Sequence, residues 1–147
     1  METETTTRPP LTILIVDDNP VDVYLIRWVL DAHELPYELQ VISNGDEALE
    51  VFDQIAQQEH PRFPMIILLD LNLPQRDGKE LLRYVKTIPL GSDIRVVIVT
   101  GSTNPADQAE TLALGADAFF VKPFHLTDFM QLGEIIKGLA FDSASEA

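Results

Sequence analysis

Ile13-Leu-Ile-Val-Asp-Asp-Asn-Pro20 is the stretch that decides the fold of this chain. Successive apolar residues such as Ile13 to Val16 are typical of a strand buried on both faces, as in a parallel sheet. Two carboxylates end this run, and Asn19-Pro20 is a favourable helix start, an N-cap residue followed by proline in the first turn. The stretch therefore predicts a buried strand, an acidic turn and a helix, in that order.

The rest of the chain repeats this alternation of short apolar runs and stretches with apolar residues three and four apart. The predicted strands lie at 11–16, 37–42, 65–69, 94–99 and 118–121. The predicted helices lie at 21–30, 46–56, 79–85, 104–115 and 127–139. The connections are too long for hairpins, so we expect parallel strands, right-handed crossovers and helices on both faces of the sheet. The sequence predicts an α/β fold of the (βα)5 type.

The length of 147 residues fits one domain with a single core. We expect a disordered N-terminal tail at 1–10, which is polar and rich in threonine, a folded domain at 11–140 and a flexible tail at 141–147. No internal repeat and no second domain is recognisable.

The composition excludes several classes of function. With 24 acidic and 10 basic side chains, the formal charge of −14 argues against nucleic acid and against an anionic membrane as the partner. The absence of cysteine excludes disulfides and thiolate metal sites. No apolar stretch approaches the ~20 residues that span a bilayer, and the N-terminus lacks the apolar core of a signal peptide. A cytoplasmic protein is the prediction.

Chemically active side chains follow four of the five predicted strands. They are Asp17 and Asp18 after the first run, Asp70 after the third, Thr100 after the fourth and Lys122 after the fifth. Each has an ordinary explanation alone, as a helix cap, a turn residue or a surface lysine. Ligands of open α/β sheets bind at the carboxyl ends of the strands, where all five residues meet. The pattern therefore favours a functional site at this edge.

The charges of this site require a cation. Three clustered carboxylates beside one lysine leave a formal charge of −2, which one divalent ion cancels. Ligands that are all oxygen indicate Mg²⁺. A site with Mg²⁺, a lysine, a hydroxyl and a free carboxylate oxygen can bind a phosphoryl group and let the carboxylate attack it, which forms an acyl phosphate.

The chain resembles the receiver domains of bacterial two-component response regulators. The resemblance covers roughly Leu11 to Leu139, and the matching motifs are Ile13-Leu-Ile-Val-Asp-Asp-Asn-Pro20, Leu68-Leu-Asp-Leu-Asn-Leu-Pro74 with Asp77-Gly78, Val97-Ile-Val-Thr-Gly101 and Val121-Lys-Pro-Phe124. It implies a flavodoxin-like, doubly wound fold with strand order 2-1-3-4-5. It also implies a signalling switch in a phosphorelay, not an enzyme with a separate substrate.

The resemblance also assigns roles to residues of the site. It implies that Asp70 accepts the phosphoryl group, that Asp18 and Asp70 bind Mg²⁺ directly, and that Asp17 does so through water. Asn72 would lend its backbone carbonyl to the ion.

Thr100 and Lys122 would hold the phosphoryl oxygens. The switch aromatic of the family falls at Phe119, which has no hydroxyl, so a rearrangement of the Thr100–Phe119 pair would depend on packing.

The expected partner is a sensor histidine kinase or a phosphotransfer protein. The wording Leu-Asp-Leu-Asn-Leu-Pro and the long 57–64 connection resemble the stand-alone regulators that serve bacterial phytochromes. Met130 and Phe141 widen the apolar stripe of the last predicted helix, which indicates an exposed patch through which two copies would pair as a homodimer.

Three other functions are compatible with parts of the pattern. An aspartyl-phosphate phosphohydrolase would carry a second acid two residues after the nucleophile, where this chain has Asn72. A flavodoxin-like flavin carrier would have phosphate-binding donors where this chain has Asp17 and Asp18. A phosphorylation-independent scaffold would not need a complete acidic site.

Overall fold

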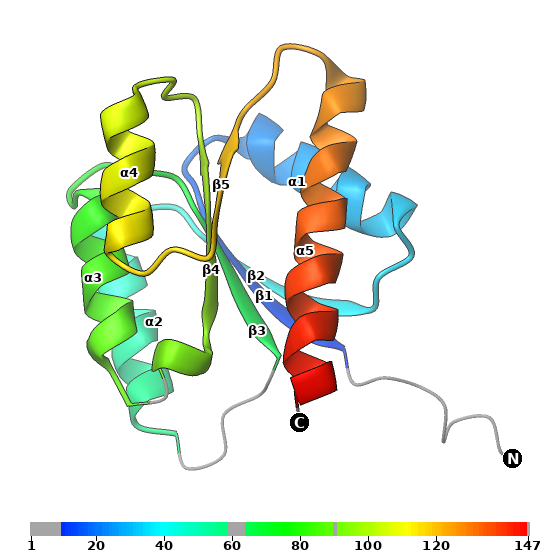
Figure 1. The fold of residues 1–147 in the computed structure, drawn as a ribbon. Helices are drawn as coiled ribbons and strands as arrows, with labels where there is room; N and C mark the ends of the chain where they lie inside the picture. The colour runs from blue at the N-terminus through cyan, green and yellow to red at the C-terminus, as the bar shows by residue number, and fades with distance from the viewer. Residues whose placement is uncertain (1–9, 59–63, 90, 147) are drawn as a thin grey trace, which may run out of the picture.

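Five strands and five α-helices alternate along the chain (Figure 1). The computed structural model describes residues 10–58, 64–89 and 91–146, with side chains up to residue 140. The strands are β1 (Leu11–Val16), β2 (Tyr37–Ile42), β3 (Met65–Leu69), β4 (Arg95–Thr100) and β5 (Ala118–Val121). The helices are α1 (Pro20–Ala32), α2 (Gly45–Ala56), α3 (Gly78–Thr87), α4 (Pro105–Ala113) and α5 (Leu126–Glu146), and a short 3-10 helix, η2 (Gly91–Asp93), precedes β4.

The strands form one parallel sheet with the order β2-β1-β3-β4-β5. Both the (βα)5 prediction and the strand order implied by the resemblance are confirmed. The order reverses between β1 and β3, which are neighbours in the sheet, and Val16 at the end of β1 pairs with Leu69 at the end of β3. Such a reversal leaves a crevice at the carboxyl ends of the strands, where ligands of this architecture bind.

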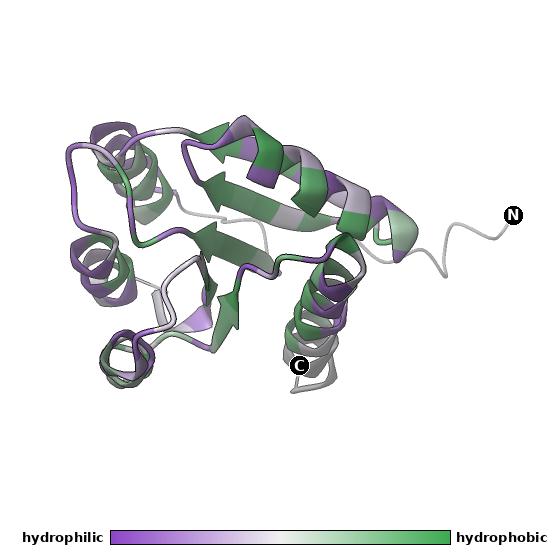
Figure 2. Cartoon of the chain, turned by 90° about the horizontal axis from the view of Figure 1, so that it is seen from above, coloured by the Kyte–Doolittle hydropathy of each residue, from purple (hydrophilic) through white to green (hydrophobic). Residues whose placement is uncertain are grey.

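Two apolar layers enclose the sheet, as Figure 1 shows: α1 and α5 cover one face, and α2, α3 and α4 cover the other. Alternate residues of β1 supply both layers: Ile13 and Ile15 pack towards α1 and α5, while Leu14 and Val16 pack towards α2 and α3. Seen from above, the strands are hydrophobic along most of their length, whereas the helices carry hydrophilic residues as well (Figure 2). A strand buried on both faces explains the continuous apolar runs in the sequence.

Helix caps fix the loops at the carboxyl edge of the sheet. The side chains of Asn19, Asn44, Asp77 and Asn104 each accept a hydrogen bond from a backbone N–H in the first turn of α1, α2, α3 and α4, at 2.8–3.1 Å. These bonds satisfy donors that a helix start leaves unpaired. The two helix starts predicted from Asn-Pro are confirmed, and the caps hold the residues that follow each strand in place.

The end of the last helix differs from the prediction. Its backbone stays helical through Glu146, so the predicted helix end at 139 was wrong. A helical backbone does not test the expected flexible tail at 141–147, which stays a prediction. The sequence after Gly138 contains no further glycine and no proline, and alanine and glutamate favour the helix, so nothing ends it locally. No helix among the described residues, α5 included, is both long and apolar enough to cross a membrane. The expected tail at 1–10 lies outside the described residues except for Pro10.

Gly78 is required where α3 begins, and its replacement tests how the fold supports the loop after β3. A Cβ at this position would lie 2.6 Å from Leu71 Cα and 2.8 Å from the carbonyl oxygen of Asp70. We expect Gly78→Ala to lower the free energy of unfolding by about 1–3 kcal/mol, because the contact is with backbone that cannot move aside.

Gly138→Ala is the matched control, since a Cβ there meets nothing within 4 Å inside α5. We expect this change to stabilise the protein by up to about 1 kcal/mol. Urea unfolding of the two variants measures both effects. Equal stability of Gly78→Ala and wild type would show that the loop after β3 is not packed as described.

Candidate functional site

Three carboxylates meet at the carboxyl ends of β1 and β3. Asp17 and Asp18 follow β1, Asp70 follows β3, and one oxygen of each lies within 4.8 Å of the others. Asp17 and Asp70 are buried, with 3% and 6% of their surface exposed, whereas Asp18 is exposed. The predicted acidic cluster is therefore present, with its open side at Asp18.

Backbone donors orient the two buried carboxylates. Asp17 Oδ1 accepts a hydrogen bond from the Asn19 N–H at 2.9 Å, and Asp70 Oδ1 accepts one from the Asn72 N–H at 3.1 Å. Asn72 also forms an isolated bridge with Asp77, just before α3. The backbone N–H of Asn72 thus lies directly beside Asp70.

Lys122 brings a positive charge into the cluster from the end of β5. Its Nζ lies 2.9 Å from Asp70 Oδ2 and 3.3 Å from Asp17 Oδ2. Its side chain is 18% exposed. Its backbone N–H donates to the Thr100 carbonyl at 2.7 Å, so β4 and β5 stay paired up to the site.

Burial and neighbouring charges change the acidity of two groups in the site. Burial raises the pKa of Asp17 from 3.8 to about 6. The hydrogen bond from the Asn19 N–H and the charge of Lys122 lower this pKa in part, and the negative charges of Asp22 and Asp70 raise it further. Burial lowers the pKa of Lys122, but hydrogen bonds to Asp22 and Asp70 outweigh it, so that the pKa is raised and the ammonium form is favoured. The site therefore holds more negative charge than its lysine neutralises.

The two predicted switch residues lie on neighbouring strands beside the cluster. Thr100, at the end of β4, is fully buried, and its hydroxyl oxygen accepts a hydrogen bond from the Ser102 N–H at 3.3 Å. No hydrogen bond among the described residues joins this hydroxyl to Asp70 or Lys122. Phe119 on β5 is half-buried, pairs with Ile98 of β4, and packs against the core on the α2 and α3 side.

A fourth carboxylate, Asp22 in the first turn of α1, also lies at the site and was not predicted from the sequence. Asp22 Oδ2 accepts a hydrogen bond from Lys122 Nζ, and its residue is 8% exposed. An acid in the first turn after the Asn19 cap is explained by the helix itself, so the sequence offered no reason to place it in the site. The only available signal was its position at the helix end that faces the carboxyl edge.

An ion-pair network across α3 and α4 was also missed. Lys79 Nζ lies 2.7 Å from Asp107 Oδ1 and 2.8 Å from Glu110 Oε1, and the Ser102 hydroxyl donates to Asp107 Oδ2. These contacts tie the loop after Thr100 to the start of α3. The partners are far apart in sequence, so no local pattern indicates them.

The acidic cluster fits a small divalent cation. An octahedral Mg²⁺ holds oxygens at about 2.0–2.1 Å, which places neighbouring ligand oxygens roughly 3 to 4 Å apart. Oxygens that lie within 4.8 Å of one another need to close only slightly to reach that spacing. The ligand set contains oxygen alone, which suits Mg²⁺ or Mn²⁺.

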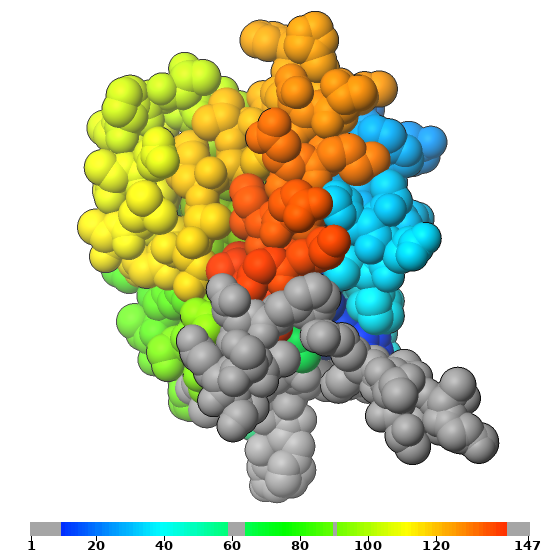
Figure 3. All heavy atoms as spheres, turned by 45° about the vertical axis from the view of Figure 1, so that its right-hand side comes forward, coloured from blue at the N-terminus to red at the C-terminus, as the bar shows by residue number. Residues whose placement is uncertain are grey.

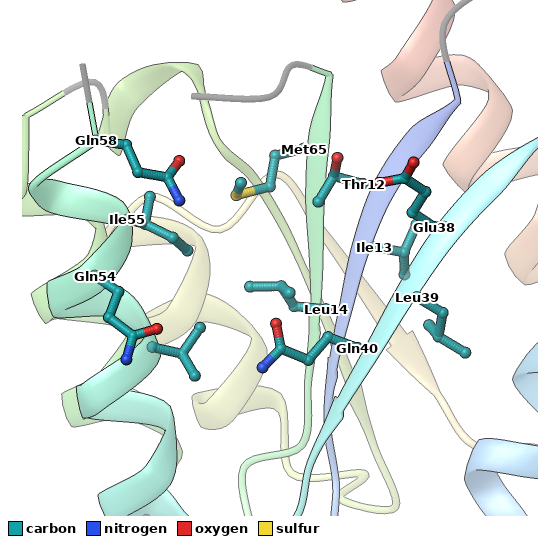
Figure 4. A pocket seen from close by; sticks show the side chains of 11 residues that line it. Thr12, Ile13, Leu14, Glu38, Leu39, Gln40, Gln54, Ile55, Gln58 and Met65 are labelled. Carbon is teal, nitrogen blue, oxygen red and sulfur yellow. The ribbon is translucent and has the colours of Figure 1, made fainter. Parts of the chain in front are cut away.

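A cavity of about 360 Å³ lies elsewhere, on the α2 side of the sheet (Figure 4). Leu14, Ile55 and Met65 contribute apolar surface to it, and Gln54 of α2 and Gln58, just after α2, point towards it. None of the predicted site residues lines this cavity, so the acidic cluster is separate from it.

Comparison with known proteins agrees with this geometry. The response regulator receiver domain family matches residues 13–134. Response regulator Rcp1 of Synechocystis sp. is 31% identical over 137 residues, 93% of each chain. The phosphorylated cyanobacterial phytochrome response regulator RcpA has a similar structure, with a TM-score of 0.77 and 30% identity over 90% of this chain and 95% of RcpA. The Mn²⁺-bound form of Rcp1 gives a TM-score of 0.74 and 33% identity, over 87% of this chain and 92% of Rcp1. The chain therefore belongs to the response regulator receiver domain family, whose members are response regulators of two-component systems.

Proposed function

We propose that this chain is a single-domain response regulator that accepts a phosphoryl group on Asp70 in a Mg²⁺-dependent reaction. The observation that carries the proposal is the position of Asp70, buried between the Lys122 ammonium and the carboxylates of Asp17 and Asp18. The donor is a histidine kinase or a phosphotransfer protein, as in two-component systems. The domain limits of 11–140 are part of this proposal, and the family match supports them.

The residues of the site divide the work of phosphoryl transfer. Asp70 is the nucleophile. Lys122 now pairs with the Asp70 carboxylate, and it is close enough to pair with a phosphoryl oxygen after that carboxylate has been phosphorylated. Asp18, Asp70 and the Asn72 carbonyl would hold Mg²⁺ directly, and Asp17 would do so through water. The ion would neutralise charge on the phosphoryl group when bound. The Mn²⁺-bound structure of Rcp1 supports a divalent ion here. Catalysis consists of positioning and charge neutralisation, without a general base.

The proposed switch is the Thr100–Phe119 pair. A phosphoryl group adds about −1.5 to −2 charges and three acceptor oxygens beside a buried hydroxyl. Thr100 can exchange its present role, as acceptor from the Ser102 N–H, for donation to a phosphoryl oxygen. Phe119 packs on the neighbouring strand and can move into the space that Thr100 leaves.

The alternatives have less support. A phosphohydrolase of the aspartyl-phosphate type needs an acid where Asn72 stands, and Asn72 contributes its backbone N–H to Asp70. A flavin carrier would place phosphate beside Asp17 and Asp18, whose charges repel it. A scaffold without phosphorylation would not require a buried lysine shared among carboxylates.

A phytochrome-type kinase is the specific partner that we propose. Similarity to Rcp1 and to the phytochrome response regulator RcpA along most of the chain supports it. We also propose a cytoplasmic location and a homodimer. Met130, which was expected in the apolar patch of the homodimer, packs against the core. We therefore propose that the patch is formed by Leu112 of α4, Val121 of β5 and Leu126 of α5, which are 39–57% exposed. The side chain of Phe141 lies outside the described residues.

Phosphorylation at one residue tests the proposed function. Phosphoramidate with Mg²⁺ should add one phosphoryl group to the wild-type protein, on Asp70, because this carboxylate adjoins both Lys122 and the proposed cation site. Asp70→Asn should fold and take up none, since an amide is nearly the same size and a poor nucleophile. Intact-protein and peptide mass spectrometry measures both results. A phosphoryl group on another residue, or none on the wild-type protein, contradicts the proposal.

The buried charge of Asp17 gives a second prediction. Its folded-state pKa of about 6 exceeds the ordinary 3.8, so the folded protein binds this proton more tightly than the unfolded chain does. Without metal, stability should therefore fall as the pH rises from about 4 to about 6, and the whole penalty is present at pH 7. We expect Asp17→Asn to raise the metal-free Tm at pH 7 by a few degrees, and the gain to shrink as the pH falls towards 4.

Mg²⁺ should raise the Tm of the wild-type protein and leave that of Asp17→Asn nearly unchanged. Asp18→Asn is the control, because Asp18 is exposed: it should lose the Mg²⁺ response with little gain in metal-free Tm. Thermal unfolding followed by circular dichroism gives all these values. If Mg²⁺ stabilises Asp17→Asn as much as wild type, the ion binds elsewhere.

A further inference from the structure

Asp22 lies at the site but has no part in the reaction proposed above. Its side chain, 11% exposed, accepts a hydrogen bond from Lys122 Nζ, a residue 100 positions away. No other hydrogen bond or ion pair joins this carboxylate to the described part of the chain. Figure 3 shows α1, in blue to cyan, beside α5, and the orange segment that links β5 to α5 above them. Asp22 therefore connects α1 to the residue that follows β5.

Lys122 Nζ contacts three carboxylates: it donates hydrogen bonds to two of them and forms an ion pair with the third. The partners are Asp22, Asp70 at 2.9 Å and Asp17 at 3.3 Å. Two of these partners change during the proposed reaction, because Asp70 gains the phosphoryl group and Asp17 is a proposed cation ligand. Asp22 is outside the group of carboxylates that could share one ion. It is the partner of Lys122 whose surroundings stay the same.

Helix stability alone does not explain the position of Asp22. An acid in the first turn interacts favourably with the helix dipole while it remains exposed to water. Asp128, in the first turn of α5, has this exposed arrangement. Asp22 is instead buried against the lysine, and a buried carboxylate is unfavourable unless it is paired. The ion pair with Lys122 therefore explains why Asp22 is buried.

We propose that Asp22 is a positioning residue for phosphoryl transfer, which holds the Lys122 ammonium so that one N–H points at the phosphoryl group on Asp70. The inference rests on the proposed function. With phosphoramidate as the donor, the bond from phosphorus to nitrogen breaks as a bond from phosphorus to an Asp70 oxygen forms. Phosphoramidate reacts with its nitrogen as an –NH3⁺ group, which leaves as neutral ammonia with the hydrogens it already carries. The negative charge of the Asp70 carboxylate cancels the positive charge of this nitrogen, and the phosphoryl oxygens keep the negative charge that they carried in the donor. Because Asp22 already holds the Lys122 side chain in one conformation, the lysine loses little further conformational entropy when it contacts those oxygens.

The kinetics of Asp22→Asn test this role. The amide keeps the size of the side chain but loses the charge that fixes the lysine. We expect the maximal rate of Asp70 phosphorylation by phosphoramidate to fall about ten- to hundredfold. The half-saturating concentration of phosphoramidate should not rise, because one negative charge has been removed near an anionic donor. Unfolding of part of the variant would lower the final extent of phosphorylation, so the extent is measured together with the rate constant, and the proposed role predicts a slower reaction that still reaches the wild-type extent.

Asp128→Asn is the matched control, since it removes an acid from the first turn of another helix without touching Lys122. It should phosphorylate at the wild-type rate. A wild-type maximal rate in Asp22→Asn, or an equal loss in Asp128→Asn, overturns the proposal.

A second measurement needs no phosphorylation. A lysine ammonium that is held by hydrogen bonds exchanges its protons slowly enough for ¹⁵N NMR to detect them, and Lys122→Met assigns the signal. We expect the signal in wild type and in Asp128→Asn, and its loss in Asp22→Asn. A signal that is unchanged in Asp22→Asn, or absent from wild type, contradicts the role of Asp22. If the wild-type protein shows the signal but takes up no phosphoryl group, the proposed function fails while Asp22 still holds Lys122.

Discussion

The ion pairs of Lys122 are the interaction on which the site depends. Asp17, Asp22 and Asp70 come from the ends of β1 and β3 and from the first turn of α1, and all three contact one ammonium group. Without this cation, three buried or nearly buried carboxylates would face one another in surroundings that favour the neutral acid. With it, the site remains negatively charged, as the proposed binding of a divalent ion requires.

The topology of the sheet makes this convergence possible. Because β1 and β3 are neighbours although a whole strand and two helices separate them in sequence, the residues after Val16 and Leu69 lie side by side. The caps at Asn19 and Asp77 then direct the chain away from the site and into α1 and α3. The strand residues at this end of the sheet are apolar and buried, and the residues that directly follow β1 and β3 are acidic. The apolar core therefore holds the acidic residues in place but contributes no reactive group to the site.

Much of the fold was predictable, because its determinants are local. The apolar runs at β1, β2, β3 and β5 match the observed strands, and β4 is displaced by one residue. The strands β1, β3 and β4 follow nearly continuous apolar residues, whereas β2 alternates apolar residues with Glu38 and Gln40. The helix starts follow capping residues. The end of α5 was not predictable in this way, because no glycine or proline after Gly138 marks where the helix stops. Its continuation to Glu146 depends on weak residue preferences.

Site residues that come directly after a strand could be predicted from the sequence, whereas those that reach the site only through contacts between distant residues could not. Asp17, Asp18, Asp70 and Lys122 could be found because each directly follows an apolar run. Asp22 could not, because an acid at that helix position has a sufficient local explanation and its contact is with a residue 100 positions away. The pairing of Lys79 with Asp107 and Glu110 has the same character.

A crystal structure of the protein with Mg²⁺ and beryllofluoride, a mimic of the phosphoryl group, tests the central claim most directly. The account predicts beryllium bonded to an Asp70 oxygen, fluorine atoms within hydrogen-bond distance of Lys122 Nζ and the Thr100 hydroxyl, and the metal ion beside Asp17 and Asp18. Beryllofluoride bound elsewhere, or Lys122 still paired with a free Asp70 carboxylate under saturating conditions, would contradict it.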